Sequence, residues 1–272
     1  MSICILVGHG KSSNGAYDSG AVSKDGKYHE YKIAREIGKY AQEYYNKTYT
    51  EKADLMNYDG SLCLSDRIEK VNKKTYDFIA EIHLNAGGGT GVECYYSKGS
   101  KEGQKYADKI CDFISADLKV KQRPYGTDED GGDKVKLTSS GADYFGIIRQ
   151  TKPTAVLIET VFIDTASDLN KVKTASGQKK CGEAIAKAIG EVRGAKKKKA
   201  QTSFKAYKVK VICDSLNIRK TPKFTKSDIV GKITDKGTYT ITAEKTVSGV
   251  PMGKLKSGQG WISLRSKYVK KL

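Results

Sequence analysis

The sequence predicts two parts of different fold class: an α/β N-terminal domain with a mostly parallel central sheet flanked by helices, and a small all-β unit. In residues 1–194, short apolar runs of strand type alternate with segments whose apolar residues recur at helical spacing, a pattern typical of α/β domains. From residue 204 onward the helical pattern is missing. Short runs rich in Val, Ile, Thr and Tyr are separated there by Gly and Pro, which indicates β structure.

The elements of each part are predicted in order along the chain. A short apolar run that ends at Gly8 predicts the first strand. The helices are predicted from apolar residues on one face, and Ser65 is expected to cap the second helix. The expected strands are 3–7, 76–84, 91–96 and 155–163, the expected helices are 31–45, 65–74, 102–118 and 176–192, and the all-β unit is expected to hold strands in 208–213, 228–233 and 238–243.

The charge of the chain is unevenly distributed. Residues 1–195 contain 29 basic and 27 acidic residues, whereas residues 196–272 contain 20 and 4, so most of the net charge of +18 lies in the last third. Such an asymmetry predicts contact with a polyanion: nucleic acid, an anionic wall polymer or a membrane surface. The charge changes at a run of four lysines, where we expect an exposed Lys-rich linker at 195–203, although the same run is also suited to gripping a polyanion.

Length and composition exclude several classes of protein. The 272 residues suggest about two domains, and no apolar run approaches the roughly 18–20 residues that span a bilayer, so membrane insertion is not expected. The first seven residues are too short and too uncharged for a secretory signal, which predicts synthesis in the cytosol without a cleaved leader. The six cysteines lie too far apart for a zinc finger, and we expect reduced, buried thiols.

Two of the three histidines follow predicted strands. His9 comes after the first strand, and His83 ends the strand predicted at 76–84. Functional groups of open α/β sheets collect at the carboxyl ends of the strands, so the two imidazoles are expected to converge and bind a metal ion. The alternative is that each histidine is a structural residue with its hydrogen bonds satisfied.

A carboxylate is the expected third metal ligand. Glu30 opens the helix predicted at 31–45, and its neighbour His29 is a rival ligand. Adjacent helical residues point about 100° apart, so one of the two is expected to face the metal. Two His and one Glu form a common catalytic zinc set, with the fourth position open for water.

Glu159 lies within the most apolar predicted strand, where a carboxylate is unfavourable unless it has a partner. One interpretation is a buried salt bridge, with Arg149 or Arg67 as the partner. The interpretation we favour is a general base with a raised pKa beside a metal-activated water, because Glu159 falls near the carboxyl end of its strand.

These residues belong to a set of landmarks that resembles a known family over about residues 1–192. The N-terminal part resembles zinc-dependent N-acetylmuramoyl-L-alanine amidases of the type called amidase 3. The landmarks, in the order of that family, are ILVGHG, HEYKIAREIGKY, LSDRIEKVN, IHLNAGGGTGVECYY and KPTAVLIETVFID.

The resemblance implies Zn²⁺ as cofactor, with His9, Glu30 and His83 as its ligands. It implies that Glu159 is the catalytic glutamate, and that Asn85 lies beside the metal ligands or in the substrate cleft. The implied reaction is cleavage, by zinc-activated water, of the amide bond between N-acetylmuramic acid and L-alanine in peptidoglycan.

Three features bear on how closely the chain follows the family. Arg67 matches a family arginine that we interpret as structural. Thr160-Val161 replaces the more usual Gly-containing stretch, and residues 124–143 form a polar, Gly-rich loop that is expected to border the cleft. None of these features removes a residue with an implied role.

The last part, residues 204–272, contains the stretches LNIRKTP, IVGKI, KGTYTI and GWIS. With these stretches it resembles a bacterial SH3-like domain, a small barrel that commonly binds the cell wall. Trp261 is expected either in the barrel core or at a ligand. An anionic wall polymer is the expected partner. Nucleic acid is not, because neither a recognition helix nor an aromatic-rich RNA-binding motif is found.

The complete sequence thus predicts a peptidoglycan hydrolase that resembles a bacteriophage endolysin: a catalytic domain at 1–194, a linker at 195–203 and a wall-binding domain at 204–272. It would be made in the host cytoplasm and would act on the wall of a Gram-positive bacterium. The alternatives are a host autolysin, a sporulation amidase, another zinc peptidase of the wall, or a non-catalytic binding protein.

Overall fold

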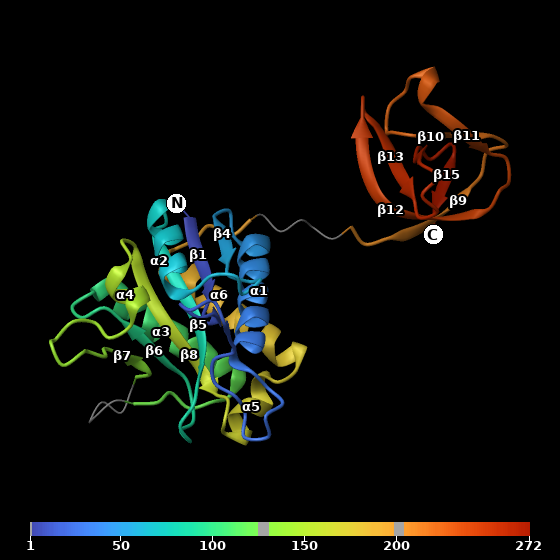
Figure 1. The fold of residues 1–272 in the computed structure, drawn as a ribbon. Helices are drawn as coiled ribbons and strands as arrows, with labels where there is room; N and C mark the ends of the chain where they lie inside the picture. Colours follow the sequence, from blue (N-terminus) through green and yellow to red (C-terminus); the bar gives the residue numbers. More distant parts are fainter. Residues whose placement is uncertain (1, 125–130, 199–203) are drawn as a thin grey trace. The chain divides into compact units, whose positions relative to one another are not determined.

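The computed structural model describes residues 2–124, 131–198 and 204–272 (Figure 1). Contacts within the chain divide it into two units, Met1–Lys198 and Lys199–Leu272. Each unit has its own apolar core. In the described part of the chain, none of the helices is long and apolar enough to cross a membrane.

The first unit is built on a six-stranded sheet, which confirms the predicted α/β architecture. Strands β4, β1, β5 and β8 are neighbours in this sheet and run parallel to one another. Strand β6 is antiparallel to β8, and β7 is parallel to β6. The sheet order is β4 (Lys52–Met56), β1 (Ser2–Val7), β5 (Phe78–Asn85), β8 (Thr154–Phe162), β6 (Glu93–Tyr96) and β7 (Asp133–Lys134).

Helices cover both faces of this sheet (Figure 1). Side chains of β1 alternate between two apolar clusters, with Ile3 and Ile5 in one and Cys4 and Leu6 in the other, because successive residues of a strand point to opposite faces. The larger cluster includes α1 (Glu30–Thr48), α3 (Lys101–Leu118) and α6 (Ala175–Val192), and the smaller one includes α2 (Leu64–Lys73) and α4 (Gly146–Gln150). Helix α5 (Ala166–Val172) follows β8 and packs against α6.

Helix α2 begins one residue before the predicted position, and Ser65 is not its cap. The N-cap is Cys63, whose backbone N–H donates to the side chain of Asp66 at 3.1 Å. This contact fixes the helix start upstream of Ser65, and the prediction at this position is wrong. All six cysteines are free, and only Cys213 is not buried.

The second unit is all-β, as predicted, apart from one short 3₁₀ turn, η1 (Lys226–Asp228). Trp261 is half-buried and lies outside the apolar core of the unit. The seven-stranded sheet has the order β11 (Ile229–Ile233), β10 (Leu216–Arg219), β14 (Trp261–Ser263), β13 (Val250–Leu255), β12 (Thr238–Val247), β9 (Tyr207–Val211) and β15 (Val269–Lys271).

The lysine run begins in contact with the first unit. The backbone of Lys196 accepts a hydrogen bond from Thr50 N–H at 2.9 Å, and Lys198 N–H donates to the carbonyl of Thr48 at 2.8 Å. Residues 199–203 of the predicted linker lie outside the described residues.

Candidate metal and catalytic site

Three predicted ligands meet at the carboxyl ends of β1 and β5. His9 follows β1, His83 lies near the end of the neighbouring β5, and Glu30 is the first residue of α1. One ligand atom from each of them lies within 4.8 Å of the other two. His29, the rival of Glu30, is the N-cap residue of α1 and is not a member of this group.

The carboxylate of Glu30 is the centre of the group. Its Oε1 lies 3.1 Å from His9 Nε2 and 2.9 Å from His83 Nδ1. The same oxygen accepts the N–H of Leu84 at 2.9 Å, and Oε2 accepts the N–H of Ala21 at 2.8 Å. Burial alone would raise the pKa of Glu30, but hydrogen bonds from the two imidazoles outweigh it and hold that pKa well below its usual range. Glu30 is therefore an ionised, pre-oriented candidate ligand.

The outer nitrogen of each imidazole faces another carboxylate. His9 Nδ1 lies 2.8 Å from Asp18 Oδ2, in the short hairpin of β2 (Gly10–Lys11) and β3 (Tyr17–Asp18). His83 Nε2 lies 3.3 Å from Glu81 Oε2. Metal-binding histidines commonly use such partners to fix the ring and its tautomer. The inner nitrogens of both rings thus stay aimed at Glu30.

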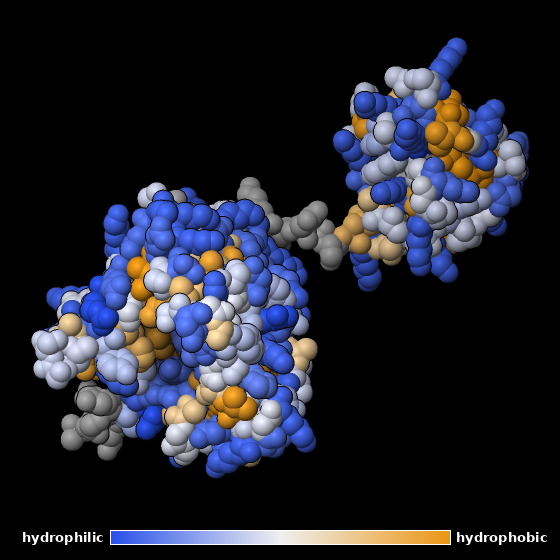
Figure 2. All heavy atoms as spheres, in the orientation of Figure 1, coloured by the Kyte–Doolittle hydropathy of each residue, from blue (hydrophilic) through white to orange (hydrophobic). Residues whose placement is uncertain are grey.

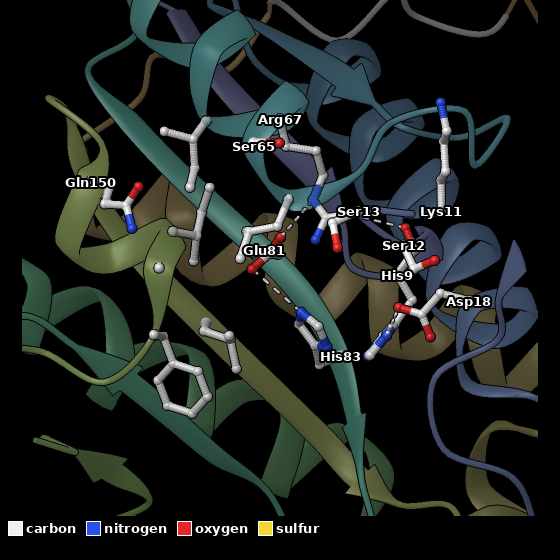
Figure 3. A pocket seen from close by; sticks show the side chains of 16 residues that line it. His9, Lys11, Ser12, Ser13, Asp18, Ser65, Arg67, Glu81, His83 and Gln150 are labelled. Carbon is white, nitrogen blue, oxygen red and sulfur yellow. Dashed lines mark hydrogen bonds and ion pairs between the residues drawn. The ribbon is translucent and has the colours of Figure 1, made fainter. Parts of the chain in front are cut away.

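Glu81 is a functional candidate that sequence analysis missed. It is 2% exposed, and its other oxygen lies 3.2 Å from Nε of the buried Arg67 (Figure 3). Arg67 also donates to the backbone carbonyls of His9 and Leu62 at 3.0 and 3.1 Å. The available clue was spacing: residues two apart on a strand share a face, so an acid at 81 must lie beside His83.

The backbone around the group is shaped to hold it closely. His9 has a φ of 60°, and Nδ2 of Asn57 donates to its carbonyl at 2.7 Å. A Cβ atom on Gly8 would lie 2.2 Å from the His83 ring, and one on Gly20 would lie 2.5 Å from the Glu30 carboxylate. Only glycine fits at these two positions, so the chain packs directly against the ligands.

The donor set fits zinc. Two imidazole nitrogens and one carboxylate oxygen are ligands that catalytic zinc sites use, with a fourth position left for water. Each imidazole has the carboxylate partner expected of a metal-bound histidine. The group could therefore hold a divalent metal ion with residues already in place.

Glu159 lies beside this group, on the neighbouring strand. In the β5–β8 register it is paired with His83, and in the β6–β8 register with Glu93. Its Oε2 is buried and has no hydrogen-bond partner among the described residues. Burial raises the pKa of Glu159 to about 7. Arg149 donates instead to the carbonyls of Asp143 and Tyr144, so no arginine neutralises Glu159 in the described part of the chain.

Comparison with known proteins identifies the family. The family model described as N-acetylmuramoyl-L-alanine amidase matches residues 3–191. The chain belongs to this amidase family. The matched range includes the group of His9, Glu30 and His83, and it also includes the adjacent Glu159.

Individual relatives agree with this assignment. A sporulation-specific N-acetylmuramoyl-L-alanine amidase of Bacillus subtilis is 29% identical over 223 residues, which cover 79% of each chain. An endolysin of Bacillus phage SPP1 is 30% identical over 284 residues, covering 97% of this chain and 95% of the endolysin. Among solved structures, Cwp6 from Clostridium difficile superposes with a TM-score of 0.62 at 29% identity, over 70% of this chain and 29% of Cwp6.

Asn85 of the amidase domain makes a hydrogen bond to a carboxylate outside the group of His9, Glu30 and His83. Its amide Nδ2 donates to Oε1 of Glu93, which is buried and paired with Lys134 and Arg123. Glu93 is in turn the register neighbour of Glu159 on β6. Asn85 thus orders the polar cluster beside Glu159, and it makes no hydrogen bond to the three ligands in the structure described.

A hollow of about 560 Å³ opens beside the group of His9, Glu30 and His83 in the amidase domain. One end is polar and includes His9, His83 and Glu81 (Figure 3). The walls between α2 and α4 are apolar, and Figure 2 shows apolar surface within a hollow on this side of the unit. Its apolar lining residues are Leu64, Ile68, Phe145, Ile147 and Leu157. Ser65, expected to be a helix cap, lines this hollow instead.

Proposed function

We propose that this chain is a zinc-dependent peptidoglycan amidase that cleaves the bond between N-acetylmuramic acid and L-alanine. His9, Glu30 and His83 would hold the zinc ion, and Glu159 would be the general base. The observation that carries the proposal is the convergence of the three ligand atoms next to Glu159, whose Oε2 is buried and has no hydrogen-bond partner among the described residues. Membership of the amidase family supplies the substrate.

The chemistry divides between the metal and the protein. Zinc bound here would act as a Lewis acid toward the substrate carbonyl and would lower the pKa of water. Glu159, whose pKa of about 7 lies near neutral pH, takes the proton from the attacking water. It then delivers that proton to the amine of L-alanine as the bond breaks. Arg67 and Glu81 keep His83 in place and take no part in proton transfer.

The second unit would bring the enzyme to its substrate. We propose that it is an SH3-like domain that binds the cell wall of a Gram-positive bacterium, and that the chain is a phage endolysin. The support is that similarity to the endolysin of phage SPP1 extends over 97% of the chain and so includes the second unit. A sporulation amidase is the second candidate, because the Bacillus subtilis relative is nearly as similar over its shorter alignment.

The reaction is tested by mass spectrometry of purified Gram-positive walls after digestion. The amidase releases intact stem peptides with a free N-terminal L-alanine, and this release stops when a chelator removes zinc and returns when zinc is restored. Peptides cut internally would indicate a peptidase, and no release by the zinc-loaded chain would indicate a binding protein. Walls of vegetative cells and of spores, digested in parallel, separate the endolysin from the sporulation amidase by which is cleaved faster.

A further inference from the structure

The second unit contains a hollow of about 540 Å³ with a polar lining. It lies in the surface of the all-β sheet, and residues of β10, β13 and β14 contribute to it. Two arginines, Arg219 and Arg265, are its only charged lining residues. The other polar lining residues include Ser215, Asn217, Ser248 and Ser263.

The carboxylates of this unit lie away from the hollow. Residues 204–272, which the structure describes throughout, contain four acidic side chains and none of them lines it. Each has a partner elsewhere: Asp214 pairs with Lys236, Asp228 accepts from Thr221, Asp235 from Tyr239 and Glu244 from Tyr207. The positive charge of the hollow is therefore not neutralised within the unit.

Both arginines have N–H groups that are available to hydrogen-bond a ligand. One nitrogen of Arg219 donates to the carbonyl of Thr225 at 2.9 Å, and its guanidinium lies 5.2 Å from the centre of the Phe224 ring. These contacts hold the group at the wall of the hollow while other N–H donors remain free. Arg265 is exposed, and within residues 204–272 the one ion pair joins Lys236 to Asp214. Arginine presents a planar fork of donors that matches phosphate and carboxylate oxygens.

Hydroxyl and aromatic groups complete the lining. Ser263 is 9% exposed, and its Oγ contacts only the N–H of Arg265, at the long distance of 3.5 Å. Ser215 and Ser248 are exposed. Phe224 is 44% exposed and offers an apolar face beside Arg219. Such a surface suits a ligand that alternates negative charges with hydroxyl groups and short carbon chains.

We propose that this hollow binds a phosphodiester-linked polyol or glycan polymer of the cell wall, with Arg219 and Arg265 on the phosphates. This inference rests on the proposed function of the second unit and assigns its site and its ligand. A polymer is favoured over a single carboxylate because residues 204–272 contain 16 basic side chains for 4 acidic ones. The positive electrostatic potential of these side chains attracts a polymer that carries a negative charge in every repeating unit.

The test is calorimetric titration of the full-length chain with soluble poly(glycerol phosphate). Poly-γ-glutamate and a single-stranded DNA oligonucleotide, matched in concentration of negative charge, serve as competing ligand classes. The variant Arg219→Gln/Arg265→Gln is compared with Lys232→Gln/Lys254→Gln, which removes the same charge from exposed positions outside the hollow. Arg265→Gln alone is included because Arg219 also holds the loop at Thr225.

We expect poly(glycerol phosphate) to bind more tightly than the other two polymers. Arg265→Gln should weaken it about tenfold, and the double arginine variant further, because hydrogen bonds to charged groups are strong. The double lysine variant should lose only about twofold to threefold, since it changes the general field alone. Equal losses in the two double variants, equal binding of poly-γ-glutamate, or tighter binding of DNA would each overturn the proposal.

A second measurement separates this site from the catalytic one. Release of stem peptide from a small soluble muropeptide, which does not need wall binding, is measured on the same protein samples. Both arginine variants should retain this activity, and Arg265→Gln should also retain the thermal unfolding temperature of the parent chain. If the parent chain itself releases no peptide, the proposed catalytic function fails, while the binding result for the hollow still stands.

Discussion

Replacing Glu81 by Gln tests how much Glu81 contributes to zinc affinity. Glu81 contacts the proposed ligand His83 and is not itself a proposed ligand. Glu81 connects the buried guanidinium of Arg67 to Nε2 of His83, at 3.2 and 3.3 Å. Gln has nearly the same shape but no charge. The change should therefore loosen the orientation of His83 and leave Arg67 without its counter-ion.

The two effects have different sizes and different readouts. Loss of a carboxylate that supports a metal-bound histidine typically weakens metal affinity about 10-fold to 100-fold, which corresponds to about 1.4–2.7 kcal/mol. The side chains of Arg67 and Glu81 are only 6% and 2% exposed. Removing one partner of such a buried pair costs about 3–5 kcal/mol of folding free energy.

Zinc affinity is measured by competition with a chromophoric chelator, and stability by urea unfolding of the metal-free protein. Glu93→Gln is the matched control, because Glu93 is also buried and paired, with Lys134 and Arg123, but contacts neither histidine. We expect both variants to lose stability and only Glu81→Gln to lose zinc affinity. Unchanged zinc affinity in Glu81→Gln would refute the assigned role of Glu81.

The remaining predictions concern the ligands, their packing and the base. His83→Ala should abolish zinc binding while His29→Ala retains it, as measured by metal analysis after dialysis; equal zinc content would exclude His83 as a ligand. Gly8→Ala should weaken zinc binding because its Cβ would lie 2.2 Å from the His83 ring, and the same chelator competition checks this. The raised pKa of Glu159, about 7, means that its carboxylate is lost as pH falls below that value, so kcat/KM on a soluble muropeptide should decline on the acid side of pH 7. A rate independent of pH between about pH 5 and pH 8 would contradict this.

Sequence patterns predicted the parts of the fold that bury most apolar surface. The parallel strands β1, β5 and β8 read as apolar runs, and α1, α3 and α6 have clear apolar faces. His9 and His83 were each predicted at the carboxyl end of a strand, and the structure shows that these two strands, β1 and β5, are parallel neighbours. Glu30 was expected beside them, and its carboxylate does lie between the two rings.

The missed features have weak local patterns or depend on distant contacts. Strand β4 lies at the sheet edge and buries only one side chain fully, Ala53, so its sequence has no apolar run. Helix α4 has five residues, too few to show helical spacing. The β2–β3 hairpin has two residues in each strand, and the position of Asp18 in it is recognisable only from its contact with His9. The amide of Asn85 donates to Glu93, on a different strand, a contact that the sequence around Asn85 does not indicate.

The central claim is that Glu159 acts as the base beside a metal held by His9, Glu30 and His83. The most direct measurement compares Glu159→Gln with the parent chain, determining bound zinc and released stem peptides in the same samples of digested wall. The account predicts one zinc ion per chain in both proteins, with peptide release lost only in the variant. Substantial release by Glu159→Gln with zinc in place would contradict the claim, because the other carboxylates beside His83, those of Glu30 and Glu81, are engaged by the imidazoles and by Arg67.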